Sequence, residues 1–597
     1  MKHKLLPFID FTVILISFFC CSSLLQVDLY QLSAPLTFSV IFILCCKLFG
    51  FYKIAIRHVG VALLTRGLLS SAAALFFVLF THGVDKVGLY FFSGLLSLCS
   101  IVFMRVAVRE YYFLKRHSKN SNTLIYGAGS AGVQFATAAL QGQTNNIIGF
   151  VDDSADLVGS YIKGCKVFET SQIEKLVLQH NVEFIVIAMP SLNGDTKRKI
   201  INKLLELPVR VVTVPTLQEI LSGSLSVSNT QHIEIEDILG RDIVPPDAHL
   251  LGARISNKTI LVTGAGGSIG SEICLQISQL DAKQIILLDV SELALFEIEQ
   301  KLINITDVKF TCVLGSVLDS ILLHKTFKKY DIDTVFHAAA YKHVPMVEDN
   351  QLSALINNVD GTMNVLAEAV EGNCTSFTLV STDKAVRPTN VMGASKRLAE
   401  LVCQANAESH NNTIISMVRF GNVLDSSGSV IPTFKKQIAS NGPVTITHRD
   451  ITRYFMTIPE AAQLVIQSAG MAKGGDVFIL DMGEPIKIYD LAKRLIRLSG
   501  KNYYEFGSAP LDVSSIRLEF TGLRPGEKLY EELLIDATAL KTSHPKIMRA
   551  KEDFFRKKEI ENYINRMKTS LNNDDFDLFY KLLEEAKIGY SSATNNM

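Results

Sequence analysis

Long apolar runs occupy the first hundred residues of the chain, and strand-like and helix-like patterns alternate after them. Each run carries only two charged side chains: Asp10 and Asp28 in residues 5–46, and Asp85 and Lys86 in residues 67–104. One membrane-spanning helix needs about 20 apolar residues, so each run is long enough for two. The pattern therefore predicts four spans, near residues 8–26, 32–50, 61–82 and 87–107.

Basic residues predict the orientation of these spans. They precede the first span, separate the second from the third, and end or follow the fourth, as Lys2, Lys4, Lys53, Arg57, Arg105, Arg109, Lys115, Arg116 and Lys119. Because basic loops stay in the cytoplasm, we expect the N-terminus and everything after residue 110 on that side. A cleaved signal peptide is the alternative for the first span, but three more apolar segments follow it, so we expect a membrane anchor.

The composition excludes several classes of function. Apolar residues make up 48% of the 597 residues and the mean hydropathy is +0.25, which excludes a disordered chain. The 59 basic residues balance the 59 acidic ones, so no electrostatic footprint for nucleic acid is expected. The ten cysteines form no CxxC pair and no cluster with zinc spacing, so we expect reduced thiols and no metal site.

A first α/β unit is expected over residues 121–250. An apolar strand, residues 123–126, leads into Gly127, Gly129 and Gly132 with a helical pattern behind them, and Asp152 ends a later strand. This order is typical of a dinucleotide-binding βαβ unit, in which small residues let backbone amides approach a pyrophosphate. A turn without a ligand would use the same glycines, and the sequence leaves both readings open.

A second glycine loop carries a stronger signal. The strand at residues 258–263 runs into Gly264, Gly267, Ser268, Ile269 and Gly270, and Asp289 ends the next strand. The spacing is that of extended short-chain dehydrogenases, and a carboxylate at this position binds the adenosine ribose and disfavours NADP, so NAD is the expected cofactor. Further contacts to NAD are expected from residues at the ends of the following strands, Ser316, Val317, Ala338, Ala339 and Ala340.

Ionisable side chains follow at the carboxyl end of another strand, where an α/β sheet places its chemistry. This strand ends in Thr382, Asp383 and Lys384, and a helix with Met392 and Lys396 comes next. In short-chain dehydrogenases these two helix positions hold tyrosine and lysine, spaced so that they share one face. A thioether cannot remove a proton, so Met392 departs from the generic motif.

Downstream basic residues and glycine–proline turns suit a diphosphate, because a guanidinium binds phosphate with two parallel hydrogen bonds. The expected substrate-binding residues are Lys342, His343, Asn422, Arg453, Arg524 and Glu527. After residue 550 the chain is charged and helical in pattern, which predicts a surface helix pair.

These motifs resemble the long membrane-bound UDP-N-acetylglucosamine 4,6-dehydratases of bacterial polysaccharide and glycan synthesis. The resemblance rests on AAAYKHVP, STDKA, VMGASKR, RFGNVL, ITRYFM and GLRPGEKL, and the long family characteristically has methionine at the position of Met392. It implies a four-span helical anchor (1–110), a Rossmann-like domain (121–250), a catalytic extended short-chain dehydrogenase domain (254–550) and a helical tail (551–597), in the inner membrane with cytoplasmic catalytic domains.

The resemblance also implies a reaction on UDP-N-acetylglucosamine. NAD takes hydride from C4, water leaves across C5 and C6, and the hydride returns to C6. Asp383 is expected to be the acid, Lys384 the base and Thr382 the partner of the 4-hydroxyl, while Lys396 holds the nicotinamide ribose. The methionine form implies retention at C5. The alternatives are a nucleotide-sugar 4-epimerase and an inactive membrane scaffold, and the oligomeric state, a homo-oligomer included, stays open.

Overall fold

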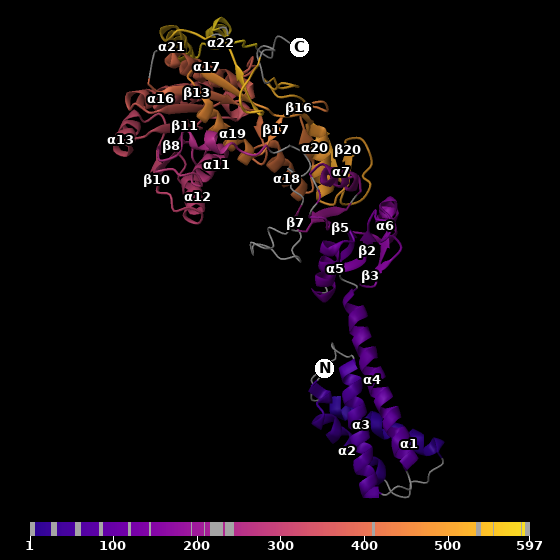
Figure 1. Ribbon diagram of the computed structural model, residues 1–597. Coiled ribbons are helices and arrows are strands. Elements are labelled where there is room, and N and C mark those ends of the chain that lie inside the picture. The colour runs from indigo at the N-terminus through magenta and orange to yellow at the C-terminus, as the bar shows by residue number, and fades with distance from the viewer. Residues whose placement is uncertain are drawn as a thin grey trace. The chain divides into compact units, whose positions relative to one another are not determined.

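The computed structural model (Figure 1) describes residues 6–25, 33–53, 61–82, 87–117, 121–142, 145–190, 192, 194–207, 209–214, 231–232, 244–408, 412–532, 539–552, 554–586 and 588–591. The chain forms two compact units. One contains residues 1–123 and 136–148, and the other contains residues 124–135 and 149–597. Each unit is described by itself.

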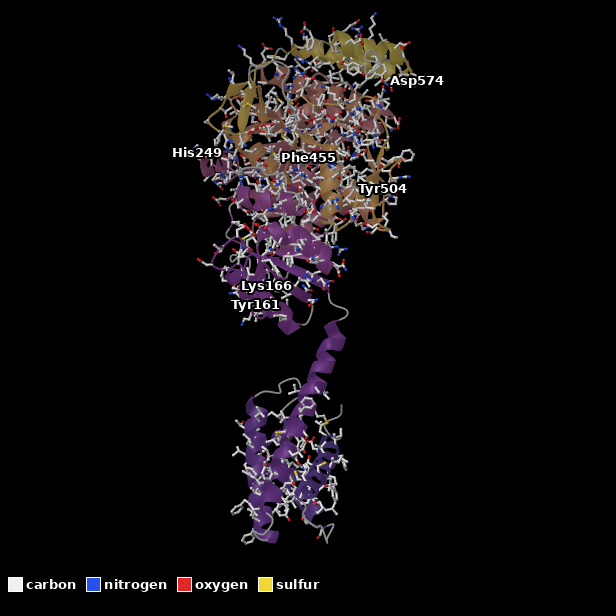
Figure 2. All side chains as sticks on the ribbon, turned by 90° about the vertical axis from the view of Figure 1, so that its right-hand side faces the viewer. Tyr161, Lys166, His249, Phe455, Tyr504 and Asp574 are labelled. Carbon is white, nitrogen blue, oxygen red and sulfur yellow. The ribbon has the colours of Figure 1, made fainter. Side chains whose placement is uncertain are left out.

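Four apolar helices pack together at the N-terminus: α1 (Leu6–Leu24), α2 (Ser33–Leu48), α3 (Val61–His82) and α4 (Val87–His117). Their buried side chains, among them Ile14, Phe18, Phe38, Phe42 and Leu98, form one hydrophobic cluster. Large apolar side chains on the other faces, such as Phe76 and Phe103, are exposed. Figure 2 shows mostly carbon on these helices, whereas nitrogen and oxygen are abundant on the C-terminal part of the chain.

Three of these helices, not four, are long and apolar enough to cross a membrane: Leu6–Leu24, Leu63–Phe80 and Val87–Val108. The prediction of a fourth span near residues 32–50 was wrong on length. Helix α2 has 16 residues, which reach about 24 Å at 1.5 Å per residue, against a hydrocarbon core of about 30 Å. The chain leaves the helix at Gly50, whose φ of 70° is the left-handed conformation that ends many helices. The three helices still suggest a membrane anchor.

An ion pair is buried inside this helical unit. The Arg105 guanidinium on α4 donates to the Asp10 carboxylate on α1 at 2.9 Å, and it lies over the Phe51 ring at 4.3 Å. The sequence pattern places Arg105 among the basic residues on the cytoplasmic side. Its charge is instead paired within the bundle, so it contributes less to the orientation signal than an exposed arginine does.

The first α/β region contains a seven-stranded sheet in the order β3-β4-β2-β1-β5-β6-β7. Its strands are β1 (Ser121–Tyr126), β2 (Asn145–Val151), β3 (Tyr161–Ile162), β4 (Cys165–Phe168), β5 (Phe184–Ile187), β6 (Arg210–Thr213) and β7 (Gln231–His232). Its helices are α5 (Ser130–Gly142), α6 (Ile173–His180) and α7 (Gly194–Leu204). Apolar runs at β1 and β5 give buried strands, as the sequence pattern predicts.

The second α/β region is built on a nine-stranded sheet in the order β10-β9-β8-β11-β12-β13-β18-β23-β22. The parallel strands are β8 (Thr259–Thr263), β9 (Gln284–Asp289), β10 (Phe310–Leu314), β11 (Thr334–His337), β12 (Ser376–Val380), β13 (Ile414–Arg419) and β18 (Asp476–Leu480). Strands β23 (Ile547–Ala550) and β22 (Leu540–Lys541) are antiparallel. The expected Rossmann-like parallel sheet is confirmed, and the strand order reverses between β8 and β11.

Helices cover both faces of this sheet (Figure 1). One hydrophobic cluster joins it to α13 (Ser320–Tyr330), α16 (Gly361–Glu371), α17 (Val391–Ala407), α21 (Lys557–Asn572) and α22 (Phe576–Glu585). The other cluster joins it to α11 (Ser268–Ile277), α12 (Glu292–Ile303) and α19 (Ile458–Met471). A smaller cluster contains α18 (Val430–Ala439), α20 (Ile488–Leu498), β15 (Val444–Ile446) and β21 (Ile516–Phe520).

Candidate active site

The loop between β8 and α11 requires its glycines. A Cβ on Gly264, whose φ is +66°, would lie 2.7 Å from the Ala339 amide nitrogen, and a Cβ on Gly270 would lie 2.0 Å from the Gly264 carbonyl oxygen. The loop therefore packs against the end of β11 and brings the first turn of α11 to the edge of a cavity of about 760 Å³. Backbone amides at a helix N-terminus suit a pyrophosphate, so the cradle fits a dinucleotide.

Asp289 fixes this loop at the end of β9. Its carboxylate accepts one hydrogen bond from the Gly266 amide and one from the Ser291 amide, both at 2.9 Å. Ser316 accepts a hydrogen bond from the Leu318 amide at 3.1 Å, so its hydroxyl is engaged in a turn. The lining of the cavity does not include four of the residues predicted to bind the cofactor, Asp289, Ser316, Val317 and Ala339. Asp289 and Ala339 instead contact the glycine loop.

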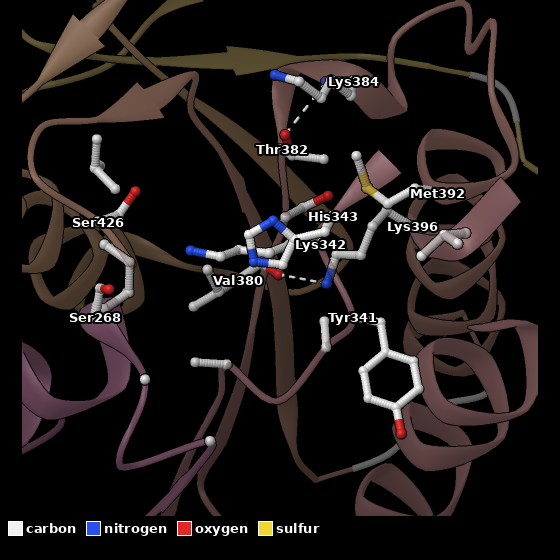
Figure 3. A pocket seen from close by; sticks show the side chains of 18 of the residues that line it. Ser268, Tyr341, Lys342, His343, Val380, Thr382, Lys384, Met392, Lys396 and Ser426 are labelled. Carbon is white, nitrogen blue, oxygen red and sulfur yellow. Dashed lines mark hydrogen bonds between the residues drawn. The ribbon is translucent and has the colours of Figure 1, made fainter. Parts of the chain in front are cut away.

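Most of the predicted site residues line this one cavity (Figure 3). They are Gly264, Gly267, Ser268, Ile269, Gly270, Ala338, Ala340, Lys342, His343, Thr382, Lys384, Met392, Lys396 and Asn422. They come from loops and from the helices α11 and α17, segments far apart in the sequence that meet at the carboxyl ends of the parallel strands. This is where an open α/β sheet binds its ligand.

The strand-end residues Thr382, Asp383 and Lys384 form a hydrogen-bonded cluster. The Thr382 hydroxyl donates to Asp383 Oδ1 at 2.9 Å, and the Lys384 ammonium donates to the same oxygen at 3.0 Å. Asp383 is 1% exposed, and its other oxygen, Oδ2, has no hydrogen-bond partner in the described part of the chain. A Cβ on Gly421 would lie 3.0 Å from that oxygen, so the carboxylate fits because the neighbour is glycine.

Charges around Lys384 keep it protonated. Burial lowers the pKa of this lysine, but the Asp383 and Glu531 carboxylates more than offset that effect, so its pKa lies above the ordinary value. The ammonium also donates to the Asn422 side-chain oxygen at 3.2 Å. A base must be neutral to accept a proton. The surrounding charges therefore favour the ammonium form of Lys384, whereas the role expected from the sequence needs the amine.

Met392 and Lys396 lie four residues apart on α17 and both line the cavity (Figure 3). Asn390 caps this helix by accepting a hydrogen bond from the Gly393 amide at 2.8 Å. The Lys396 ammonium donates to the Val380 carbonyl at 2.8 Å. Burial lowers the pKa of Lys396 to about 8, with Glu400 opposing the shift.

A second cavity of about 310 Å³ is lined by all six residues predicted to bind substrate: Lys342, His343, Asn422, Arg453, Arg524 and Glu527. The two cavities share Lys342, His343, Lys384, Asn422 and Ser429. Burial lowers the pKa of Lys342 and of His343, and the Lys342 charge lowers the pKa of His343 further.

The Arg453 guanidinium is buried and already has partners within the protein. It is 8% exposed, donates to the Thr452 carbonyl at 2.7 Å and pairs with Glu527 at 3.2 Å. Its Nε lies 3.6 Å from Glu531. A diphosphate at this arginine would therefore compete with carboxylates of the protein.

The sequence did not single out Glu531 or Asn390. Asn390 precedes a helix and is a recognisable cap, so capping rules would have found it. Glu531 belongs to a charged stretch that reads as surface, and only the tertiary fold brings it to Lys384. Among the described residues, no three His, Cys, Asp or Glu side chains are grouped to hold a metal ion.

Comparisons with known proteins agree with this architecture. A family model described as "Polysaccharide biosynthesis protein" matches residues 260–552, and one described as "CoA-binding domain" matches residues 48–215. The chain is 43% identical over 483 residues to the capsular polysaccharide biosynthesis protein CapD of Staphylococcus aureus, covering 79% of each chain. It is 40% identical over 512 residues to the probable polysaccharide biosynthesis protein EpsC of Bacillus subtilis, covering 82% of each.

A third relative matches a shorter part of the chain. A UDP-glucose 4-epimerase of Rickettsia canadensis is 33% identical over 290 residues, which cover 47% of this chain and 78% of the epimerase. The chain thus belongs to the CapD and EpsC family of polysaccharide biosynthesis proteins, within the extended short-chain dehydrogenases.

Proposed function

We propose that the protein catalyses the NAD-dependent 4,6-dehydration of UDP-N-acetylglucosamine to a UDP-4-keto-6-deoxy sugar. The observation that carries this proposal is the cluster of Thr382, Asp383 and Lys384 at the end of β12. Loss of water across C5 and C6 needs both an acid and a base, and this cluster offers both side by side.

The first α/β turn of the second region fits the cofactor. The glycine cradle would hold the pyrophosphate, Asp289 the adenosine ribose and Lys396 the nicotinamide ribose. NAD held there would supply the hydride chemistry, as acceptor for C4 and donor for C6. The remaining chemistry consists of proton transfers, and the side chains of this protein carry them.

The hydrogen bonds define a route for the proton of the 4-hydroxyl. Thr382 donates its own proton to Asp383, so its oxygen is free to accept one from the sugar. A proton that leaves O4 through Thr382 reaches Asp383, which can then give it to the departing 6-hydroxyl. The proton lost at O4 thereby becomes part of the water released, and no tyrosine is needed at the Met392 position.

Lys384 would accept the C5 proton and later return it. It must enter the reaction as an amine, whereas its neighbours favour the ammonium. The rate should therefore rise with pH as more Lys384 becomes neutral. Since one group removes and returns the proton from one side, we propose that the configuration at C5 is retained.

A product analysis with variants tests this function. The full-length protein in detergent is incubated with UDP-N-acetylglucosamine in deuterated buffer, and the sugar is identified by NMR. We expect a 4-keto-6-deoxy sugar with deuterium at C5 from the wild type, and none from Asp383→Asn or Lys384→Ala with NAD still bound. Asp490→Asn and Lys493→Ala, at a partly exposed ion pair on α20, are matched controls that should keep full activity. Full turnover by either site variant would overturn the assignment.

A 4-epimerase is the second candidate, favoured by the similarity to the Rickettsia enzyme. An epimerase moves hydride off C4 and back, and needs no acid–base pair for C5 and C6. It would give the 4-epimer without deuterium at C5. An inactive scaffold would leave the sugar unchanged.

We also propose the division of the chain that the sequence predicts, with an anchor in residues 1–110, domains at 121–250 and 254–550, and a tail at 551–597. The positive-inside pattern favours a cytoplasmic catalytic domain. If α2 crosses the membrane, the N-terminus and the catalytic domain lie on one side, and if it does not, they lie on opposite sides. Protease protection of an N-terminal epitope in spheroplasts distinguishes the two cases.

A further inference from the structure

We propose that Glu531 is a third charged residue of the acid–base site, a positioning residue that acts through Lys384. It would hold the Lys384 ammonium between two carboxylates and set the pH at which that side chain becomes an amine. The kinetic part of this inference rests on the proposed dehydration, in which Lys384 accepts a proton. The electrostatic part holds for any reaction at this site.

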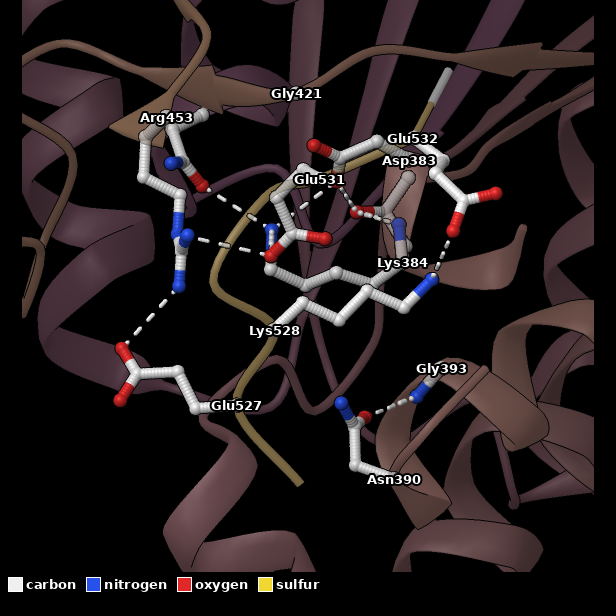
Figure 4. Close-up of polar contacts among 12 residues, drawn as sticks. Asp383, Lys384, Asn390, Gly393, Gly421, Arg453, Glu527, Lys528, Glu531 and Glu532 are labelled. Carbon is white, nitrogen blue, oxygen red and sulfur yellow. Dashed lines mark hydrogen bonds and ion pairs between the residues drawn. The ribbon is translucent and has the colours of Figure 1, made fainter. Parts of the chain in front are cut away.

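The geometry of Glu531 is that of a bridge between two cations (Figure 4). Its Oε1 lies 3.6 Å from Lys384 Nζ and 3.6 Å from Arg453 Nε. The side chain is 4% exposed and lines the smaller cavity, so solvent screens these charges weakly. An exposed pair at this distance would contribute little, but a buried carboxylate shared by two cations is strongly coupled to both.

The protein clamps the segment that carries Glu531. The Gly526 carbonyl accepts hydrogen bonds from Thr389 at 2.9 Å and from Asn390 at 3.0 Å, beside the start of α17. On the other side, the Leu529 carbonyl accepts a hydrogen bond from the Thr452 amide at 3.2 Å. These hydrogen bonds hold the backbone that leads to Glu531 beside the N-terminus of α17, which keeps the residue close to Lys384.

The charges that face Lys384 decide the direction of the effect. Asp383 and Glu531 are the negative groups, Arg453 is the positive group on the far side of Glu531, and Lys342 and His343 line the same two cavities. Replacing Glu531 by glutamine removes one of two attractive charges and leaves the cations in place. The ammonium form of Lys384 loses stabilisation, so its amine form should appear at lower pH.

Competitive labelling of lysine amines measures this without using catalysis. Full-length protein in detergent is treated with trace formaldehyde and cyanoborohydride across a pH series, and Lys384 methylation is quantified by mass spectrometry. In Glu531→Gln the labelling curve of Lys384 should move to lower pH, with about a tenfold faster reaction at a fixed pH below the midpoint for each unit that the pKa falls. Superimposable curves for wild type and Glu531→Gln would overturn the proposal.

The neighbouring acid supplies a matched control. Glu532 contacts Arg387 at 3.1 Å and Lys528 at 3.5 Å, and its side chain is 40% exposed. Glu532→Gln removes the same charge one residue away and should leave the Lys384 curve in place. Glu531→Asp keeps the charge on a shorter side chain and should fall between wild type and Glu531→Gln. If Glu531→Gln does not fold, an unshifted Lys384 curve in Glu531→Asp overturns the proposal.

The pH dependence of kcat tests the role of Glu531 in catalysis, and it can fail independently of the labelling experiment. In Glu531→Gln the rising limb of kcat against pH should move to lower pH. The rate is measured at saturating UDP-N-acetylglucosamine, because the variant also removes a carboxylate that competes with a diphosphate for Arg453 and so changes KM. A merely structural role would lower kcat at every pH without moving the limb. If the wild type forms no keto sugar, the proposed function fails, and the labelling result still decides the role of Glu531.

Discussion

Met392 stands where many short-chain dehydrogenases carry the tyrosine that removes a proton, and a thioether has no proton chemistry to offer. The hydroxyl nearest to the acid in this site belongs to Thr382, which donates to Asp383 at 2.9 Å. Thr382 lines the larger cavity, whereas Asp383 is buried and is not part of the lining. The threonine hydroxyl can therefore pass a proton from the cavity to Asp383. It would thereby take over the proton transfer that tyrosine performs in other short-chain dehydrogenases.

Thr382→Val tests this role with a side chain of nearly the same shape. Without the hydroxyl, the 4-hydroxyl proton has no path to Asp383, and kcat should fall by about 10²–10⁴-fold, the usual contribution of general acid–base catalysis. Thr382→Ser restores the hydroxyl and should recover most of kcat. The measurement is the rate of keto-sugar formation with NAD content checked in each variant. A valine variant with wild-type kcat would rule the relay out.

Lys396 gives a second test, by pH. Because burial lowers its pKa to about 8, the side chain loses its charge as the pH rises from 7 to 9. A charged donor forms a stronger hydrogen bond than a neutral one by about 1 kcal/mol, so the affinity for NAD should fall about fivefold over this window. Titration of apoprotein with NAD across the pH range measures this. Lys396→Met should bind more weakly and without that pH dependence, and a flat wild-type curve would contradict the assignment.

At the scale of elements, the C-terminal helices α21 and α22 carry the charged surface that their sequence pattern predicts. The opposite face of each helix is buried. Ile564 on α21 and Phe579 on α22 belong to the same hydrophobic cluster as Leu398 on α17. The helix that carries Met392 and Lys396 is thus covered by the end of the chain, and its position depends on that packing.

Phe579→Ala should destabilise the catalytic region by about 3–5 kcal/mol, the usual cost of removing a fully buried phenylalanine. Phe576 lies three residues earlier on the same helix with 47% exposure, and Phe576→Ala should change stability by less than about 1 kcal/mol. The apparent melting temperature of both variants, followed by circular dichroism, measures the difference. Equal melting temperatures would show that α22 is not part of the core.

Sequence motifs alone were sufficient to predict the glycine loop and the aspartate that holds it. Gly264, Gly270 and Asp289 act within one βαβ unit, so spacing alone identifies them. The length of α2, the Asp10–Arg105 pair and the approach of Glu531 to Lys384 depend on where the chain turns and on contacts across long separations. Periodicity and composition carry no information on such contacts.

At the scale of the whole molecule, the same turn is built twice. In the first α/β region the Asp152 carboxylate accepts from the Ala128 amide at 2.7 Å and from the Ser154 amide at 2.9 Å. In the second, Asp289 makes the equivalent bonds to Gly266 and Ser291. The loop geometry is shared, while the cluster around Lys384 and the cavities described above belong to the second region, to which we assign NAD.

Two equivalent glycine variants test that assignment. A Cβ on Gly270 would lie 2.0 Å from the Gly264 carbonyl oxygen, and one on Gly132 would lie 2.1 Å from the Gly127 carbonyl oxygen, so either alanine distorts its own loop. We expect Gly270→Ala to lose NAD and Gly132→Ala to keep it. NAD released by heat denaturation is quantified per chain. Loss of NAD from Gly132→Ala alone would place the cofactor in the first region.

The central claim is that hydride leaves C4 of the sugar and returns to C6. UDP-N-acetylglucosamine deuterated at C4 tests it most directly, with the wild-type protein in ordinary water and NMR of the product. Our account predicts a 4-keto-6-deoxy sugar with one deuterium in its C6 methyl group. Deuterium retained at C4, in the starting sugar or in its 4-epimer, would contradict it.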